Sequence, residues 1–233
     1  MTYLIHTGVE NGLAFKIMES VRKGKGLTED MEKAMREAGV EDWYIESCKR
    51  IKYMFPKAHA VAYVMMAFRI AYFKVFYPLA YYAAFFSIRA KAFDYQLMCQ
   101  GRDKLEYFLA EYRKKKENGT ITPKEEDAIK DMRIVQEMYA RGYEFLPIDL
   151  YRSKATKFQV IDGKLLPSFS TIDGMGDKAA EAVVDAAKDG EFLSKDDFRM
   201  RTKVSKTVID LMSDLGLFGD LPETNQLSLF DMM

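Results

Sequence analysis

TIDGMGDKAA, residues 171–180, places a Gly-x-Gly turn directly before a predicted helix. Glycine lets the backbone N–H groups of such a turn face outward, and the start of a helix carries a partial positive charge that favours an anion. Ile172 precedes the turn, and small or β-branched residues follow it: Ala179, Ala180, Val183 and Val184. This pattern predicts a helix-hairpin-helix, in which a DNA backbone docks without sequence readout. An ordinary helix-capping turn is the alternative interpretation.

The sequence downstream repeats the pattern in a weaker form. Three short helices are predicted at 177–188, 195–201 and 206–215. The last two are joined by KVSK, residues 203–206, a second hairpin that is poor in glycine. Together the two hairpins predict a tandem unit.

The chain before residue 142 is predicted to be helical throughout. Apolar spacing, caps and breakers place helices at 10–21, 28–39, 42–53, 56–76 and from Pro78 onward. Two long charged helices follow between Arg102 and Gly142. The period then changes, because 157–161, Asp162-Gly163 and 164–166 read as strand, type I′ turn and strand. The expected fold class is mainly α: a helical region, a small β-hairpin and a tandem helix-hairpin-helix domain.

The composition describes a chain that can bury a core but that carries no net charge. It has 233 residues, of which 48% are hydrophobic, with 35 basic and 35 acidic residues. Any affinity for a polyanion must therefore come from an uneven distribution of charge along the chain.

Residues 47–93 supply that unevenness, and we call them the basic island. No Asp or Glu occurs in them, and aromatic residues alternate there with small ones. Fixed cations attract phosphate and aromatic faces accept stacked bases, so the island is predicted to be a functional surface. Its cations are Lys49, Arg50, Lys52, Lys57, Arg69, Lys74, Arg89 and Lys91.

The predicted helix at 56–76 gathers part of the island on one broad face. At 100° per residue, Tyr63 and Lys74 fall within about 60° of His59, and Arg69 lies about 80° to the other side. A triphosphate would fit such a face. In the alternative interpretation the aromatic residues pack a core while the cations reach past them to solvent.

QLSLF, residues 226–230, follows a polar stretch almost at the C-terminus, and we call it the terminal pentad. An exposed Leu-Phe pair on a flexible tail is suited to anchor in an apolar pocket of a partner, with the Gln amide fixing the register. Docking of the pentad onto its own domain is the alternative.

Signatures of bond-making chemistry are missing from the sequence. There is no Asp-x-Asp triplet for a two-metal centre, and His6 and His59 are the only histidines, without a marked nucleophile. Cys48 and Cys99 lie far apart without a C-x-x-C spacing, which argues against a disulfide framework or a zinc site. We therefore predict no catalytic residue and no metal ligand in this chain.

A reduced, cytoplasmic location is expected, since no signal peptide is visible at the N-terminus. The longest charge-free piece of the island, residues 75–88, contains Pro78 and is shorter than the ~20 residues that span a bilayer. No membrane contact is predicted, although a helical protein of the membrane surface is a weaker alternative.

Four blocks of sequence together resemble one family. They are MESVRKGKGL at 18–27, WYIESCKRIKYMFPKAHA at 43–60, YRS at 151–153 and the terminal pentad. The chain resembles, over nearly all of its length, the C-terminal third of the PolC-type (C-family) DNA polymerase III alpha subunit, the replicative polymerase of low-GC Gram-positive bacteria.

The resemblance implies three regions. Residues 1–142 would belong to the fingers, 143–221 would hold the β-hairpin and a tandem helix-hairpin-helix DNA-binding module, and 222–233 would be a flexible tail with a sliding-clamp-binding motif. The site residues implied are Lys57, His59, Tyr63 and Arg69 for the incoming nucleotide, Gly174, Gly176, Lys178, Ser205 and Lys206 for duplex DNA, and Gln226, Leu227, Leu229 and Phe230 for the clamp.

The family's palm with its metal-binding aspartates, its thumb, its exonuclease and its N-terminal domains have no counterpart in this sequence. The resemblance thus implies part of a DNA-directed DNA polymerase, a nucleotidyltransferase of chromosome replication, that is inactive alone and binds no cofactor itself. Mg²⁺ would be held by the missing palm. The expected partners are primer-template duplex, a deoxynucleoside triphosphate, the sliding clamp and the rest of the polymerase. The alternative is a stand-alone, non-catalytic module that binds DNA and the clamp.

Overall fold

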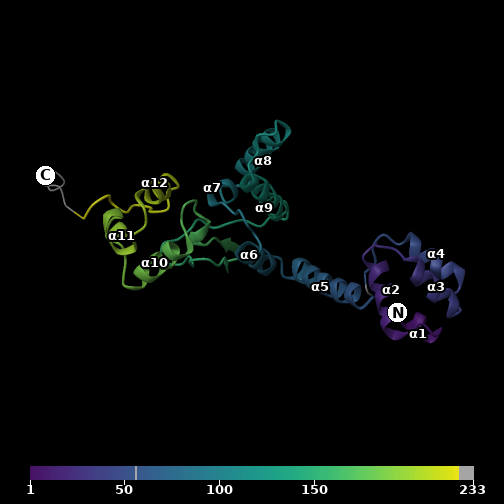
Figure 1. Cartoon of the computed structure of the whole chain (residues 1–233). Helices are drawn as coiled ribbons and strands as arrows, with labels where there is room; N and C mark the ends of the chain where they lie inside the picture. The colour runs from purple at the N-terminus through teal and green to yellow at the C-terminus, as the bar shows by residue number, and fades with distance from the viewer. Residues whose placement is uncertain (56, 226–233) are drawn as a thin grey trace, which may run out of the picture. The chain divides into compact units, whose positions relative to one another are not determined.

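The computed structural model describes residues 1–55 and 57–225 and is mainly α, as predicted (Figure 1). It divides into two compact units, Met1–Arg69 and a second unit that begins at Ile70. The boundary predicted after Gly142 therefore falls inside the second unit. Each unit is described by itself.

The first unit is a cluster of short helices. These are α1 (Thr2–His6), α2 (Asn11–Arg22), α3 (Glu29–Glu37) and α4 (Asp42–Arg50), followed by the start of α5 (Lys57–Phe76). Glu10 caps α2 by accepting from the N–H groups of Gly12 and Leu13, and Thr28 caps α3 as its sequence position predicts. The core of this unit consists of Leu4, Val9, Ala14, Ile17, Val21, Met35, Val40, Ile45 and Cys48.

The turn after α2 brings two of the family-like sequence blocks together. Gly24 has φ +71°, and a Cβ built on it would lie 1.9 Å from the carbonyl oxygen of Lys52. Close by, the N–H of Met54 donates to the carbonyl of Arg22 at 3.1 Å. Only glycine allows this close backbone approach, which fixes the path of the chain leading toward α5.

Helix α5 has no buried residue, although most of its side chains are apolar. The interpretation in which its aromatic residues pack a core therefore does not hold in the part of the chain that the structure describes. Phe68, for example, is 73% exposed. By length and hydropathy alone, α5 is long and apolar enough to cross a membrane. The charge-free stretch 75–88, on which the prediction of no membrane contact was based, is a different and shorter segment.

The second unit begins with a helical layer. Its helices after α5 are α6 (Pro78–Ile88), α7 (Tyr95–Met98), α8 (Arg102–Glu117) and α9 (Pro123–Ala140). Pro78 and Pro123 occupy the first turns of their helices, where proline is favoured. Helices α8 and α9 are the two long charged helices predicted between Arg102 and Gly142, and they pack side by side as a helical hairpin (Figure 1).

A two-stranded antiparallel sheet covers this helical layer. Strands β1 (Gln159–Ile161) and β2 (Lys164–Leu166) pair with Val160 opposite Leu165. Asp162 and Gly163, at φ 50° and 75°, form the connecting turn with two left-handed residues, as a type I′ turn requires. Phe158 and Leu165 lie in the same core as Leu105, Leu109, Met132, Val135 and Met138.

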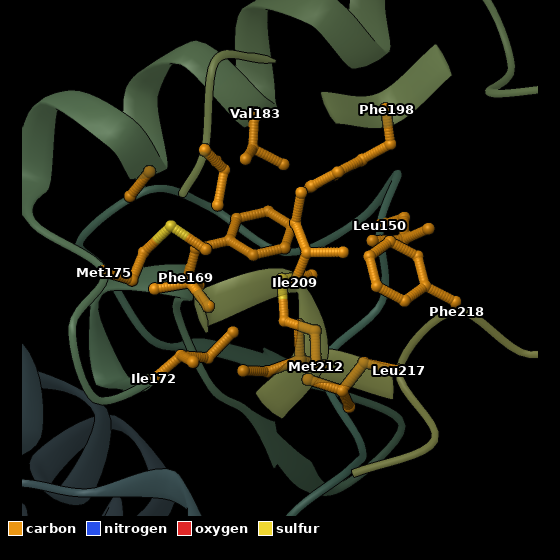
Figure 2. Packing of buried hydrophobic residues seen from close by; sticks show 14 of the residues in the cluster. Leu150, Phe169, Ile172, Met175, Val183, Phe198, Ile209, Met212, Leu217 and Phe218 are labelled. Atoms are coloured by element: carbon orange, nitrogen blue, oxygen red, sulfur yellow. The ribbon is translucent and has the colours of Figure 1, made fainter. Parts of the chain in front are cut away.

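The last part of the chain forms a separate core. A 3-10 turn η1 (Phe169–Thr171) leads to α10 (Asp177–Lys188), α11 (Lys195–Thr202) and α12 (Lys206–Asp214), within a residue or two of the predicted bounds. Figure 2 shows the packing around Phe169, with Met175, Val183, Ile209 and Met212 close to its ring. Residues from both predicted hairpins enter this one core, so the tandem unit is a single packed module.

Candidate nucleic-acid interface

Within the turn at 173–176, Met175 is the residue that is buried in the core. Its N–H donates to the carbonyl of Ile172 at 3.0 Å. Gly174, next to it, has φ +80°, and a Cβ there would meet a methyl group of Val208 on α12 at 3.2 Å. The turn therefore packs against the second helix pair on one side and leaves Gly174, Gly176 and Lys178 exposed on the other.

The start of α10 is open. Its N-cap is Gly176, which has no side chain to cap the helix, and the first N–H that bonds within the helix is that of Ala180, to Gly176. Within the described part of the chain the N–H groups of Asp177 and Lys178 have no acceptor. Unpaired N–H groups at an exposed helix start are the elements from which a phosphate-binding turn is made.

The second hairpin also contains a residue in the left-handed conformation, but its residues differ from those of the first. Lys203 takes the left-handed conformation at φ 58°, where the first hairpin uses glycine. Ser205 caps α12, because its hydroxyl accepts from the N–H of Val208 at 3.4 Å. The predicted DNA contacts Ser205 and Lys206 are both exposed, but one donor at this helix start is already used internally.

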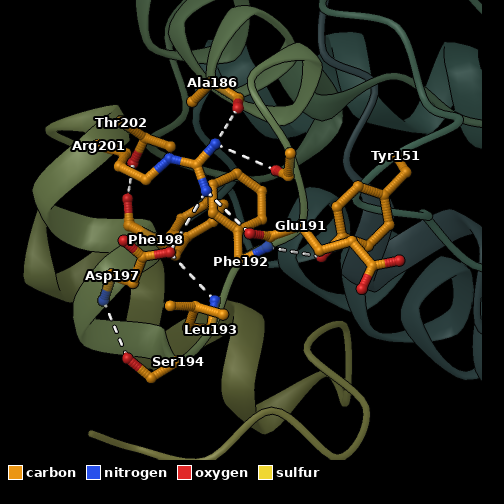
Figure 3. Close-up of polar contacts among 11 residues, drawn as sticks. Tyr151, Ala186, Glu191, Phe192, Leu193, Ser194, Asp197, Phe198, Arg201 and Thr202 are labelled. Carbon is orange, nitrogen blue, oxygen red and sulfur yellow. Dashed lines mark hydrogen bonds and ion pairs between the residues drawn. The ribbon is translucent and has the colours of Figure 1, made fainter. Parts of the chain in front are cut away.

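Arg201 fixes the two helix pairs to one another (Figure 3). Its guanidinium donates to the carbonyls of Ala186, Gly190 and Glu191 at the end of α10, and it lies over the ring of Phe192 at 4.5 Å. This basic residue therefore has a structural role, and it joins the C-terminal end of α10 to α11.

The YRS block has a place in the same network. The Tyr151 hydroxyl accepts from the N–H of Phe192 at 3.0 Å, and the two rings stack. Ser153 is buried and accepts from the N–H of Asp149 at 3.1 Å. Tyr151 and Ser153 therefore help to position the hairpin module, while Arg152 between them is exposed.

A pocket of about 420 Å³ lies beside the first hairpin. Lys91, Asp94 and Lys124 contribute to it from the helical layer, and Asp173 and Gly174 contribute from the hairpin. The Lys124 ammonium lies 2.9 Å from the Asp173 carboxylate, so a cation offsets the acidic charge that directly precedes the turn. Sequence reasoning named Lys91 only as a cation of the basic island and did not name Lys124, since neither is near the hairpin in the chain and no spacing links them to it.

The predicted nucleotide residues lie along α5, and all four are exposed. The His59 ring stacks on Phe55 with centroids 5.4 Å apart and contacts Tyr63 at 4.2 Å. Lys57 and Arg69 form no ion pair with any described residue, so their charges are available to a ligand.

Lys74 belongs to a different environment from the other cations of α5. It lies in the second unit, and its ammonium pairs with Glu137 of α9 at 2.6 Å. Its charge is thus largely used within the fold, unlike those of Lys57 and Arg69.

The predicted clamp residues Gln226, Leu227, Leu229 and Phe230 lie outside the described residues. The chain just before them is ordered on α11, since the N–H groups of Lys195 and Asp196 donate to the carbonyls of Pro222 and Glu223.

Comparison with known proteins shows what the chain is similar to. Residues 142–227 match the helix-hairpin-helix motif family. The chain is 50% identical over 230 residues to DNA polymerase III PolC-type of Caldanaerobacter subterraneus subsp. tengcongensis, and 51% identical over 231 residues to that of Bacillus cereus. Both matches cover 99% of this chain and 16% of the relative. The chain thus matches, over nearly its whole length, a C-terminal portion of PolC-type DNA polymerase III.

The extent of the match refines the resemblance inferred from the sequence blocks. The chain spans about a sixth of the length of the curated PolC-type relatives that it matches, not a third. The alternative interpretation of residues 171–180 as an ordinary capping turn is also set aside, because the helix-hairpin-helix match includes them.

In residues 1–55 and 57–225 there is no group of three or more His, Cys, Asp or Glu side chains that could hold a metal ion. No role in binding Mg²⁺ is therefore assigned to these residues.

Proposed function

We propose that this chain is the part of a replicative DNA polymerase that grips duplex DNA by its backbone. The observation that carries the proposal is the open start of α10, where Gly174, Gly176 and Lys178 are exposed and the N–H groups of Asp177 and Lys178 have no acceptor within the described residues. Backbone donors and a lysine bind phosphate without reading bases, which suits an enzyme that copies every sequence.

The first hairpin is the stronger phosphate site of the two in this proposal. Its helix start is uncapped, whereas Ser205 caps the start of α12. Ser205 and Lys206 would then supply a weaker contact, through the hydroxyl proton and the ammonium, to a neighbouring phosphate of the same duplex.

The α5 face supports a role in binding the incoming deoxynucleoside triphosphate. Lys57 and Arg69 carry free positive charge, and the His59 and Tyr63 rings lie in contact with one another on the same helix. Cations attract the triphosphate and ring faces accept a base. Their individual contacts would depend on the rest of the polymerase.

The remaining assignments follow from the length of the relatives. The chain covers 16% of them, so the palm aspartates and their Mg²⁺ would be in the polymerase outside this sequence, and the chain alone would not extend a primer.

The terminal pentad would bind the sliding clamp. The proposed location is cytoplasmic. Arg69 argues against a membrane span, because an arginine in the inner part of a spanning helix would cost up to about 3 kcal/mol.

Duplex binding tests the proposed backbone grip. The dissociation constant of the chain for a short duplex should rise steeply with salt and should change little with sequence, because released counterions drive phosphate binding. Gly176→Ala should weaken this binding about tenfold, because the added methyl group would stand where the phosphate approaches. The fold should not change, since a Cβ at this position meets no protein atom within 4 Å.

Gly174→Ala is the matched control for that substitution. It strains a turn with φ +80° and contacts Val208, so it should lower both the stability of the module and its affinity for DNA. Salt-independent binding, or a Gly176→Ala chain that binds duplex as well as the parent, would contradict the proposed grip.

The alternative of a stand-alone module predicts the same DNA binding but no contribution to synthesis. A primer-extension assay with the rest of a PolC-type polymerase separates the two.

A further inference from the structure

We propose that the start of α11 anchors the chain just before the terminal pentad, so that the sliding clamp and the DNA-binding module are held at a set spacing. This inference rests on the proposed clamp binding of the pentad. It adds a positioning device, made by Lys195 and Asp196 of α11 and by the carbonyls of Pro222 and Glu223.

The anchor consists of backbone hydrogen bonds at a helix start. The N–H of Lys195 donates to the Pro222 carbonyl at 2.9 Å, and the N–H of Asp196 donates to the Glu223 carbonyl at 3.1 Å. Asp197 completes the turn by donating to the Ser194 hydroxyl at 3.0 Å. The first three N–H groups of α11 are therefore all paired, two of them with the end of the chain.

This pairing distinguishes α11 from the helices on either side of it. The first N–H groups of α10 have no acceptor in the described residues, and α12 is capped only by its own Ser205. These hydrogen bonds stabilise the docked position of residues 222–223, because unpaired N–H donors at a helix start are costly. The 222–223 segment takes the place that a ligand could occupy at α10.

Side chains reinforce the backbone contacts. The Lys195 ammonium pairs with the Glu223 carboxylate and lies 5.8 Å from the centre of the Phe218 ring, which is buried in the module core. The Lys195 side chain is only 17% exposed. Residues 222–223 are thus held by one ion pair and two backbone hydrogen bonds, and the contact with Phe218 positions the Lys195 side chain.

The anchor leaves a very short leash. Only Thr224 and Asn225 separate Glu223 from Gln226. Two extended residues reach about 7 Å, so a clamp that holds the pentad must sit close to the start of α11. At its other end α11 leads directly into the second hairpin, and eight helical residues span about 12 Å.

A short leash has a measurable consequence for joint binding. When one molecule binds two linked partners, the effective concentration for the second step falls roughly as the −3/2 power of leash length once the leash exceeds the span. A clamp on the same duplex should therefore strengthen DNA binding by this chain far more than a long flexible tail would allow.

The test compares three affinities of the full chain: for a purified bacterial sliding clamp, for a short duplex, and for the clamp loaded on duplex. The coupling factor is the affinity for the clamp loaded on duplex divided by the product of the two separate affinities. Insertion of 20 Gly/Ser residues after Asn225 lengthens the leash from two to 22 residues, which should lower the coupling factor about 30-fold. Both separate affinities should remain unchanged.

A second pair of variants breaks the anchor at constant length. Lys195→Pro removes the N–H donor at the first helical position, where proline fits, and also removes the ion pair. Lys195→Ala removes the ion pair but keeps the backbone bond. Lys195→Pro leaves only the Asp196 hydrogen bond to hold the segment. Release of residues 222–223 lengthens the leash from two to four residues, so the coupling factor should fall by up to about threefold, while Lys195→Ala should retain more of it.

The outcomes separate this proposal from the clamp assignment. Phe230→Ala should abolish binding to the clamp alone; if it does not, the clamp assignment and this proposal both fail. If Phe230→Ala abolishes clamp binding but the 20-residue insertion leaves the coupling factor unchanged or raises it, the anchor does not set the spacing and this proposal alone is overturned.

Discussion

Single glycines decide the local path of this chain where two backbone segments meet. Gly24 allows the carbonyl of Lys52 to approach, and Gly174 allows the first hairpin to pack on Val208. Both have positive φ. The sequence marks both as turn residues, but only the structure shows that one faces a backbone atom and the other a side chain.

Gly24→Ala tests the close approach in the first unit. Gly26→Ala is its control, because Gly26 has a similar φ of +76° but open space around an added Cβ. The control should cost about 1–2 kcal/mol for the left-handed backbone, and Gly24→Ala should cost about 1–3 kcal/mol more for the clash with Lys52.

Trp43, the only tryptophan of the chain, lies in the first unit and reports on its unfolding in denaturant. Equal losses of unfolding free energy in the Gly24→Ala and Gly26→Ala chains would show that the approach to Lys52 does not constrain this unit.

Arg201→Ala tests the link between the two hairpins. It removes donors to three carbonyl groups and the contact with Phe192, so the free energy of unfolding of the second unit should fall by about 2–3 kcal/mol. Arg199→Ala, which changes an exposed arginine of the same helix, should change it by less than about 0.5 kcal/mol.

Denaturant unfolding followed by far-UV circular dichroism, with Trp43 fluorescence as an internal reference for the first unit, measures this effect. A stable Arg201→Ala module would mean that the hairpins are oriented by their apolar core alone.

At the scale of elements, the α8–α9 hairpin is joined by a capping box and an ion pair. The Thr122 hydroxyl accepts from the N–H of Glu125, while the Glu125 carboxylate accepts from the N–H of Thr122. Glu125 also pairs with Lys115 at 2.7 Å. The Lys115 ammonium and the Thr122 donors hold the pKa of Glu125 at about 2, below its ordinary value of 4.5.

Acid should therefore weaken this helical hairpin in a defined window. A carboxyl group with a lowered pKa contributes stability that is present above pH 4.5 and is lost as the pH falls toward 2. Glu125→Gln keeps the capping geometry but cannot titrate. The thermal midpoint of the wild-type chain should exceed that of Glu125→Gln at pH 7, and the difference should vanish near pH 2.

Glu117→Gln, at the exposed end of α8, is the control for that comparison, since Glu117 forms no ion pair with a described residue. A difference between wild type and Glu125→Gln that does not depend on pH would contradict the assigned coupling to Lys115.

Elements with a strong local signal could be predicted from the sequence. The second long charged helix starts at Thr122-Pro123, a cap followed by a proline, and Asp162-Gly163 forms the predicted turn, because caps and left-handed turns depend on a few adjacent residues. The four-residue α7 and the 3-10 turn η1 were not predicted, since neither has a period of its own. The Lys124–Asp173 pair and the Arg201 contacts could not be predicted either, because they join residues that only the tertiary fold brings together.

The candidate site was predictable to different degrees. The first hairpin was identified from its glycines, and the structure adds that its helix start is open while that of the second is capped by Ser205. The α5 face was predicted from charge and aromatic content, but burial was not: the sequence allowed a core helix, and the described structure leaves every residue of α5 unburied.

At the scale of the whole molecule, the exposed apolar surface of α5 and the short coverage of the relatives point the same way. A 20-residue apolar helix without buried residues is an unusual surface for a protein acting by itself. The curated relatives are about six times longer than this chain, and the proposed palm lies in the part that the chain does not cover. We expect this surface to contact the rest of the polymerase.

Primer extension with a divided polymerase tests the central claim most directly. The remainder of a PolC-type polymerase, expressed without the portion that this chain matches, is mixed with the chain, and complex formation is verified by co-elution. The account predicts that neither part extends a primer alone and that the complex does, with Gly176→Ala reducing extension at moderate salt. A co-eluting complex that does not extend the primer, or a remainder that extends it equally well without the chain, would contradict the account.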